Sequence, residues 1–219
     1  MAARWVSFDC YGTLVDWLTG MRAAMTQVAP SGHVDGLLRA YHEHEPRVQA
    51  EQPFRRYREV LAEALRRAVA EQGVELGEPG AAVLAATLPS WPVFGDVGTA
   101  LQALRGEGWR LAILSNVDDD LLAGTLQRLP AVIDLAVTAE QVQAYKPAEP
   151  HFRRFRELAD PGAWVHVAQS RSHDITPAQR LGIPCVWVNR TREPEPAGAA
   201  DAVVPDLVGI AGIVTSVLR

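Results

Sequence analysis

Short apolar runs that alternate with helical segments constrain the fold of this chain more than any other feature. The runs predict strands at residues 4–8, 109–114, 135–138, 163–168, 185–188 and 202–204. The segments between them predict helices at residues 96–105, 118–129, 150–158, 176–181 and 207–218. A run such as 111–114 is apolar at every position, which is typical of a parallel strand buried on both faces. The alternation therefore predicts an α/β fold built on a doubly wound parallel sheet.

One long helical block, residues 16–92, interrupts this alternation after a single strand. Its apolar residues recur at helical spacing, as Leu37 and Tyr41 illustrate. The block predicts a helical cap inserted into a core domain that is formed by residues 1–15 and 93–219. A chain of 219 residues is long enough for such a core with a large insertion. Ligands in doubly wound sheets bind at the carboxyl ends of the strands, so the residues that follow strands are the candidates for a site.

Polar side chains follow four of the predicted strands. Asp9 ends the first strand, Ser115 and Asn116 end the second, Lys146 follows the third, and Asp174 follows the fourth. Taken singly, each has a plainer interpretation as a turn residue, a helix N-cap or an exposed loop lysine. Their shared place at one edge of the sheet favours a common site. A carboxylate there can attack carbon or phosphorus and form an ester, and a nearby lysine would hold it ionised.

Composition and charge exclude several other classes of function. The formal net charge of −5 argues against a broad basic surface for nucleic acid. No apolar stretch is long enough to cross a membrane, and the N-terminal segment lacks the apolar core of a signal peptide, so we expect a cytoplasmic protein. The two isolated cysteines, Cys10 and Cys185, form neither a disulfide framework nor a metal-binding spacing.

The four strand-end motifs, in this order, resemble those of the haloacid dehalogenase superfamily, and the resemblance covers nearly the whole chain, including the cap. The opening motif runs from Asp9 through Tyr11 to Thr13. Phosphatases of the superfamily have a second aspartate where Tyr11 stands, and it protonates the leaving alcohol. A tyrosine there resembles the L-2-haloacid dehalogenases, in which a halide leaves without a proton. The phosphatases also place an acidic Mg²⁺ ligand where Gln169 stands, and a neutral amide is a poor replacement.

The resemblance implies a mechanism and a set of roles. Asp9 would displace halide from C2 of a small 2-halocarboxylate and form an ester, which water would then hydrolyse. Asp174 would orient or activate that water, and Lys146 would support both carboxylates. No metal or other cofactor is implied for this branch, and a homodimer is a candidate assembly because related enzymes are often dimers. The residues expected to bind substrate are Tyr11, Thr13, Arg39, Ser115 and Asn116, with Ser115 on the carboxylate, Asn116 and Arg39 on the halide, and Arg47 and Arg55 as alternatives to Arg39.

Three residues depart from the dehalogenase pattern. Phe152 stands where a tyrosine is usual, while Gln169 and Arg171 replace a serine and an asparagine. Two other functions therefore stay open. One is a Mg²⁺-dependent phosphatase that uses the same Asp9 on a small phosphoester. The other is a non-catalytic member that binds a small anion or a protein. The sequence leaves the halogen, the chain length and the enantiomer of the substrate undetermined.

Overall fold

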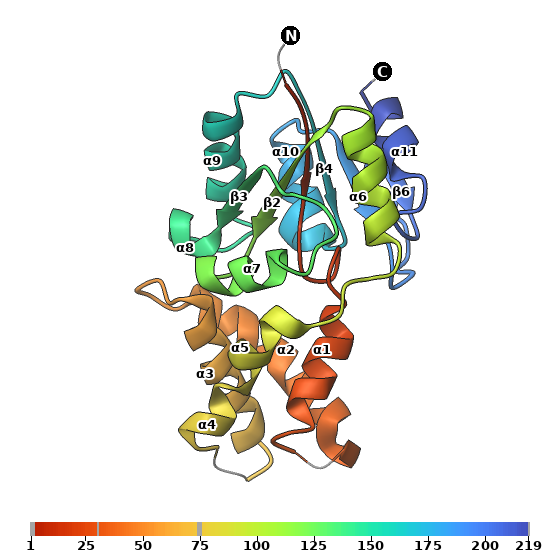
Figure 1. Ribbon diagram of the computed structural model, residues 1–219. Helices are drawn as coiled ribbons and strands as arrows, with labels where there is room; N and C mark the ends of the chain where they lie inside the picture. Colours follow the sequence, from red (N-terminus) through yellow and green to blue (C-terminus); the bar gives the residue numbers. More distant parts are fainter. Residues whose placement is uncertain (1–2, 30, 74–75, 219) are drawn as a thin grey trace.

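A six-stranded parallel sheet forms the core in the computed structural model, which describes residues 3–29, 31–73 and 76–218 (Figure 1). The order across the sheet is β3-β2-β1-β4-β5-β6, and every neighbouring pair is parallel. The chain leaves the central strand β1, builds one side with β2 and β3, and completes the other with β4 to β6. This order confirms the predicted doubly wound fold and puts the switch point beside β1. The strands are β1 (Arg4–Phe8), β2 (Arg110–Ser115), β3 (Leu135–Thr138), β4 (Ala163–Ala168), β5 (Cys185–Val188) and β6 (Ala202–Val204).

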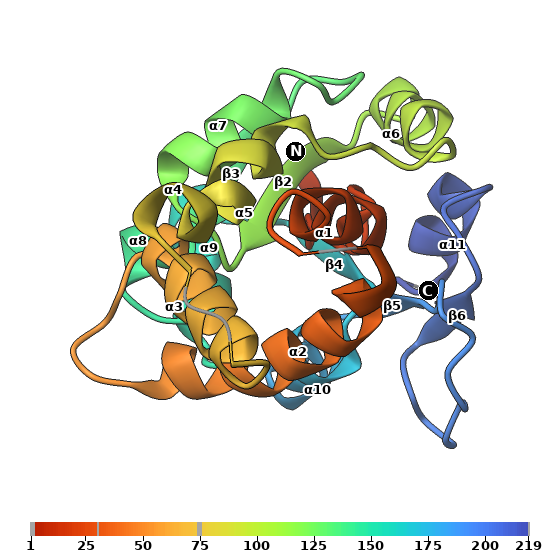
Figure 2. The same cartoon turned by 90° about the horizontal axis from the view of Figure 1, so that it is seen from below.

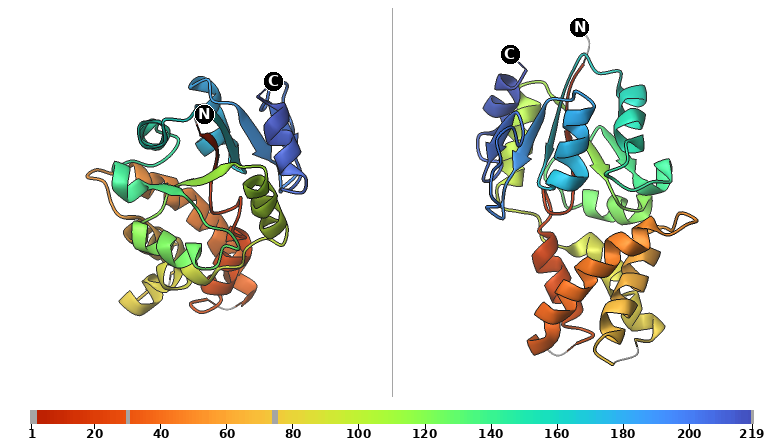
Figure 3. Two further views of the ribbon diagram at one scale, coloured as in Figure 1. Left: turned by 45° about the horizontal axis from the view of Figure 1, so that its top comes forward. Right: turned by 180° about the vertical axis from the view of Figure 1, so that it is seen from behind.

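Helices cover both faces of the sheet because alternate strand residues point to opposite sides. Phe8 and Val167 pack in the cluster that contains α6 (Val97–Gly106) and α11 (Ile210–Ser216). Trp5 packs on the other face against Phe155 of α9 (Pro150–Ala159), with ring centroids 5.5 Å apart. The same face is covered by α10 (Thr176–Arg180), and Figure 3 shows this layer from behind.

The predicted core elements agree closely with the observed ones. Five of the six described strands have the predicted bounds, and β2 is shifted by one residue. The last helix, α11, begins three residues later than predicted, because Gly209 has a positive φ of 72° that lies outside the helical region. The pattern did not predict α8 (Ala139–Val142) or the π-helical turn at Arg171–Ile175, and α7 (Asp119–Leu126) is shorter than expected.

The described part of residues 17–87, between β1 and α6, folds into helices that lie across the carboxyl edge of the sheet, as Figures 1 and 2 show from two directions. The long pair α2 and α3 packs through buried apolar side chains such as Leu37 and Leu61. Breaks at residues 31–33 and 51–56 separate the helices, as the glycine and proline there predict. The helices are α1 (Trp17–Met25), α2 (Val34–Ala50), α3 (Tyr57–Ala70), α4 (Glu78–Ala81) and α5 (Val83–Thr87).

Two antiparallel connections join this helical cap to the sheet. The Asp16 backbone N–H donates to the Pro92 carbonyl at 2.7 Å, and the Phe94 N–H donates to the Leu14 carbonyl at 3.0 Å. The pairing fits the proposed division into a core of residues 1–15 and 93–219 and a cap of residues 16–92. Residues 1, 2 and 219 of that core and 30, 74 and 75 of that cap lie outside the described part. No described helix is both long and apolar enough to traverse a bilayer.

Candidate active site

Lys146 joins two carboxylates at the carboxyl edge of the sheet, beside the switch point. Its Nζ donates hydrogen bonds to Asp9 Oδ1 at 2.9 Å, to Asp174 Oδ1 at 2.6 Å and to the Leu114 carbonyl at 2.8 Å. Lys146 and Asp174 are each 1% exposed, and Asp9 is 8% exposed. The structure thus brings together the three residues predicted to be catalytic, with one buried ammonium group between two carboxylates.

The shared lysine controls how these groups ionise. Burial alone would lower the pKa of Lys146, but Asp174 and Asp9 outweigh burial and raise it, so the ammonium stays charged. Burial would raise the pKa of Asp174, yet Lys146 and a hydrogen bond from His166 hold that pKa at about 2. For Asp9, burial raises the pKa, and Lys146 and Thr13 offset it only in part because Asp174 repels a second negative charge.

The loop after β1 orients Asp9. The hydroxyl of Thr13 donates to Asp9 Oδ2 at 2.9 Å and accepts the backbone N–H of Gln169 at 2.9 Å. Gly12 turns the loop with a φ of +96°, and a Cβ there would lie 3.3 Å from Gln169 Oε1. Thr13 is fully buried and does not line the cavity, so its position corrects the expectation of a substrate-binding residue: it orients Asp9 instead.

A cavity of about 340 Å³ lies between the sheet edge and the cap. Two buried atoms of its lining, Ser115 Oγ and Asp174 Oδ2, have no hydrogen-bond partner among the described residues. Because buried polar atoms are normally paired, these two are the atoms most available to a ligand or to water. The core contributes Asp9, Tyr11, Gly12, Ser115, Asn116, Lys146, Gln169, Ser170, His173 and Asp174, and the cap contributes Trp17, His42, Glu45, Pro46, Gln49 and Tyr57.

Tyr11 and Asn116 line this cavity, but their polar atoms are already engaged. The Tyr11 hydroxyl is 2.8 Å from Thr125 Oγ1, and burial raises its pKa well above the usual value. Asn116 donates to the Lys146 carbonyl at 3.1 Å and accepts the Lys146 N–H at 2.7 Å. Tyr11 therefore presents its ring rather than an acid, and the Asn116 amide holds the backbone of Lys146.

The structure places the arginines expected at the halide elsewhere. Arg39 is exposed on α2, where its guanidinium lies near Gly36, and it does not line the cavity. Arg47 is also exposed, and Arg55 pairs with Glu51 at 3.0 Å. None of the described residues that line the cavity is an arginine. Arg39, expected to bind the halide, thus lies away from the cavity on the exposed side of α2.

The cap wall instead carries His42 together with Glu45 and Gln49, two residues that the sequence did not single out for substrate. His42, Glu45 and Gln49 lie on one face of α2 and point to the cavity. Their spacing of three and four residues is the signal that marks one helix face. That spacing alone could not identify the face that meets the core, since the apolar residues of α2 also recur every three or four positions.

A buried polar chain supports Asp174 from beneath the cavity. Trp164 Nε1 donates to Ser7 Oγ at 2.7 Å, Ser7 Oγ lies 2.8 Å from His166 Nδ1, and His166 Nε2 lies 3.0 Å from Asp174 Oδ1. The Trp164 indole N–H can only donate, so Ser7 Oγ accepts from it and directs its own hydrogen to His166 Nδ1. His166 Nδ1 is then an acceptor, and the hydrogen on Nε2 is donated to Asp174. Ser7 of β1 and His166 of β4 lie opposite each other in the sheet. The sequence signal for this pair was a polar residue within each of two otherwise apolar strands.

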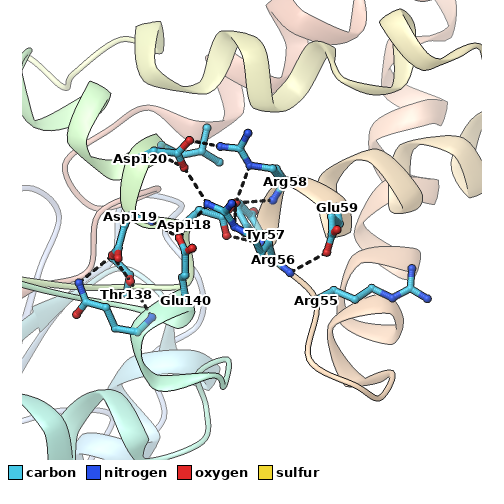
Figure 4. Close-up of polar contacts among 12 residues, drawn as sticks. Arg55, Arg56, Tyr57, Arg58, Glu59, Asp118, Asp119, Asp120, Thr138 and Glu140 are labelled. Atoms are coloured by element: carbon cyan, nitrogen blue, oxygen red, sulfur yellow. Dashed lines mark hydrogen bonds and ion pairs between the residues drawn. The ribbon is translucent and has the colours of Figure 1, made fainter.

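Ion pairs beside the cavity connect the cap to the core (Figure 4). Arg56 contacts Glu140 at 3.0 Å and Asp120 at 3.3 Å, and Arg58 bonds to Asp120 and to Asp118. The two arginines flank Tyr57 at the start of helix α3, whereas the acidic residues lie at the starts of α7 and α8. Arg56 and Arg58 thus tie the cap to the core at the side of the cavity.

The donor set does not fit a magnesium ion. The two carboxylates of the site, Asp9 and Asp174, share Lys146, whose ammonium occupies the position between them. Gln169 stands where the phosphatases of the superfamily have an acidic Mg²⁺ ligand, and its amide is neutral. Mg²⁺ sites are usually built on carboxylates and substrate phosphates. The described part of the chain contains no cluster of three His, Cys, Asp or Glu residues that could hold a metal.

Comparisons with known proteins agree with this geometry. Residues 3–182 match the family model of the haloacid dehalogenase-like hydrolases. The chain is 26% identical over 195 residues to (S)-2-haloacid dehalogenase 4A of Burkholderia cepacia, covering 85% of this chain and 83% of that protein. A solved L-2-haloacid dehalogenase matches with a TM-score of 0.84 and 23% identity, covering 98% of this chain and all of that one. The Xanthobacter autotrophicus enzyme with chloropropionic acid covalently bound matches with a TM-score of 0.82 and 20% identity, covering 97% and 98%.

Proposed function

The chain belongs to the haloacid dehalogenase-like hydrolase family, and from that premise we propose that it hydrolyses the carbon–halogen bond of a small 2-haloalkanoic acid. One observation carries the choice of bond. Asp9 shares Lys146 with Asp174, while the neighbouring Tyr11 has its hydroxyl on Thr125. This arrangement supplies a nucleophile without a second acid for an alcohol leaving group. The curated relative named above acts on (S)-2-haloacids, which supports the same substrate class.

In the first step a carboxylate oxygen of Asp9 attacks C2 of the substrate. A bond forms between that oxygen and C2, the carbon–halogen bond breaks, and halide leaves with the bonding electrons. Halide needs no proton, so a tyrosine in place of the acid is compatible with this chemistry. The free Oγ of Ser115 is the candidate donor to the substrate carboxylate.

In the second step water hydrolyses the ester. The water oxygen attacks Cγ of Asp9 and gives a proton to Asp174, whose Oδ2 is buried and has no partner among the described residues. The tetrahedral intermediate, stabilised by the charge of Lys146, breaks the bond between Cγ and the substrate oxygen. That oxygen takes the proton from Asp174, and Asp9 releases the remaining proton to solvent. Substrate and water thus give a 2-hydroxy acid, halide and one proton.

Two assays on the purified chain test the proposal. The first measures halide release from chloroacetate, fluoroacetate and 2-chloropropionate with EDTA present, for the wild type and for Asp9→Asn. We expect release that survives EDTA and disappears in the variant. A single turnover in ¹⁸O-water should place the label in Asp9, because water attacks that carbonyl rather than C2.

The second assay measures phosphate release from a generic phosphoester with Mg²⁺. Phosphate release that requires Mg²⁺ would replace the proposal by the phosphatase alternative. If neither halide nor phosphate appears across a broad panel, the non-catalytic binding function replaces both. The expected loss in Asp9→Asn must come without a loss of folded structure, which circular dichroism checks.

A further inference from the structure

Glu45 gives the cap wall of the cavity a carboxyl group where an arginine was expected. Its Oε1 accepts hydrogen bonds from the Tyr57 hydroxyl at 2.7 Å and from Gln49 Nε2 at 3.3 Å. Burial raises the pKa of Glu45, and hydrogen bonds from Tyr57 and Tyr41 offset this in part. The buried hydroxyl of Tyr41 is a second tyrosine donor beside this carboxyl group. Oε1 of Glu45 is thus held in place, while the carboxyl group lines the cavity and can accept a further hydrogen bond from a ligand.

No cationic side chain among the described residues forms an ion pair with Glu45. Lys146 already bonds to Asp9, Asp174 and a carbonyl oxygen. His42 stacks on Trp17 with ring centroids 5.0 Å apart, and burial lowers its pKa, so it is neutral near pH 7. Glu45 is the one carboxyl group among the described cap residues that line the cavity, and it lies beside the polar side chains of Gln49 and Tyr57.

The position of Glu45 is fixed through Tyr57. The Tyr57 backbone N–H bonds to Asp118 of the core at 2.6 Å, and its ring is buried. The hydroxyl at the other end of this side chain donates to Glu45. A rigid acceptor in a partly desolvated wall discriminates strongly between ligands that do and do not supply a donor, because an unpaired buried polar group is destabilising.

Resting on the hydrolysis proposed at Asp9, we propose that Glu45 is a specificity-determining residue that binds a hydroxyl group on the carbon chain of the substrate. The preferred substrate is then a 2-halo acid with a hydroxyl beyond C2 rather than a simple alkyl 2-halo acid. Its carboxylate lies toward Ser115 in the core, and its hydroxyl lies toward the cap. A hydroxyl both donates and accepts, so it pairs with Glu45 in either protonation state.

A matched pair of substrates tests this inference. In 2-chloro-3-hydroxypropionate a hydroxyl replaces the terminal methyl of 2-chlorobutyrate, so the two differ little in size. We expect the wild type to prefer the hydroxy acid by at least about tenfold in kcat/KM, since a site built to bond a hydroxyl rejects the analogue that lacks it. Glu45→Leu should reduce that preference to near one, and Glu45→Gln, which keeps an acceptor, should retain part of it.

The control variant is Glu43→Gln, which changes an exposed residue of the same helix and should leave the preference unchanged. Equal kcat/KM for both substrates in the wild type overturns the role of Glu45 while leaving the hydrolysis at Asp9 intact. No halide from either substrate, or from the simple haloacids, would instead mean that the proposed function has failed, and this inference with it. Should Glu45→Leu not fold, Glu45→Gln decides the question, since a preference unchanged from the wild type in that variant would overturn the role of Glu45.

Discussion

Asp118 of the core caps a helix of the cap: its Oδ1 accepts a 2.6 Å hydrogen bond from the backbone N–H of Tyr57, the first residue of α3. Its Oδ2 accepts the N–H of Arg58 at 3.0 Å. Asp118 also stands at the N-cap position of α7, yet its side chain makes no capping bond there. The fully buried carboxylate of Asp118, in the core, thus accepts from two N–H groups in the first turn of a cap helix. The N–H groups of a first helical turn have no partner within their own helix.

Removal of this cap should weaken both the fold and the cavity. Asp118→Ala leaves two helix N–H groups without their acceptor, and we expect a decrease of about 2 kcal/mol in the free energy of unfolding. KM should rise because Tyr57 and Glu45 lose their anchor. Urea denaturation and steady-state kinetics measure the two effects. The control Asp120→Ala removes an exposed partner of Arg56 and Arg58, worth about 0.5 kcal/mol, and equal effects of the two variants would contradict the capping role.

Replacement of Lys146 tests the centre of the site. Lys146→Met keeps much of the side-chain volume but leaves Asp9 and Asp174 buried together without a cation. Both carboxylates should then become harder to ionise, and we expect kcat to fall by about 100-fold or more. Lys146→Arg is the matched charge-retaining variant, and it should recover part of the activity only if its larger head fits. An unchanged kcat in Lys146→Met would remove the lysine from the mechanism.

Lys146 also shows how much of the site the sequence could predict. It is the only lysine in a chain that otherwise uses arginine for its basic residues. Its meeting with Asp9 and Asp174 was predictable because the carboxyl ends of parallel strands share one edge. The strand bounds were predictable for a different reason. Strands that are buried on both faces appear as uninterrupted apolar runs, so their ends are easy to locate in the sequence.

The cap was less predictable than the core. Arg39 and Glu45 both lie on α2, and which of them faces the core depends on how that helix packs, not on its periodicity. The sequence indicates that α2 is amphipathic but does not contain the rotation of the helix relative to the sheet. Thr13 was misassigned for a related reason: the direction of a single hydroxyl follows from the loop conformation at Gly12, which the motif does not encode.

The ionisation of Asp9 should determine the acid limb of the pH profile. Burial raises its pKa above the ordinary 3.8, and only the ionised carboxylate can attack. Activity should therefore be present above this raised pKa and be lost as the pH falls through it. The measurement is kcat/KM against pH in constant-ionic-strength buffers, with folding followed by fluorescence at each pH. An acid limb that lies below pH 3.8 would contradict the direction of the shift.

His166 should act as a positioning residue through Asp174. His166→Phe keeps an aromatic ring beside Phe152, whose ring centroid lies 5.2 Å away, but removes the hydrogen bond to Asp174 Oδ1. The pKa of Asp174 should rise, and ester hydrolysis should slow more than ester formation. Mass spectrometry of the enzyme during turnover should then show accumulated ester on Asp9. Ser7→Ala, which removes the bond to His166 Nδ1, should shift the same observables less, and a merely structural role would lower activity without ester accumulation.

His151 should make the fold sensitive to mild acid. Burial and the charge of Lys146 lower the pKa of His151 to about 3. The Nε2 atom of His151 lies 3.2 Å from the carbonyl oxygen of Ser115. Below an unfolded-state pKa of about 6.5 the unfolded chain binds a proton that the folded chain refuses, so stability is complete above that pH and decreases toward pH 3. The loss should reach about 2 kcal/mol at pH 5, because each pH unit of linkage corresponds to about 1.4 kcal/mol. In His151→Gln this linkage is absent, so its free energy of unfolding should approach that of the wild type as the pH falls from 7 to 5. Parallel curves for the two proteins would show that His151 titrates normally in the folded state.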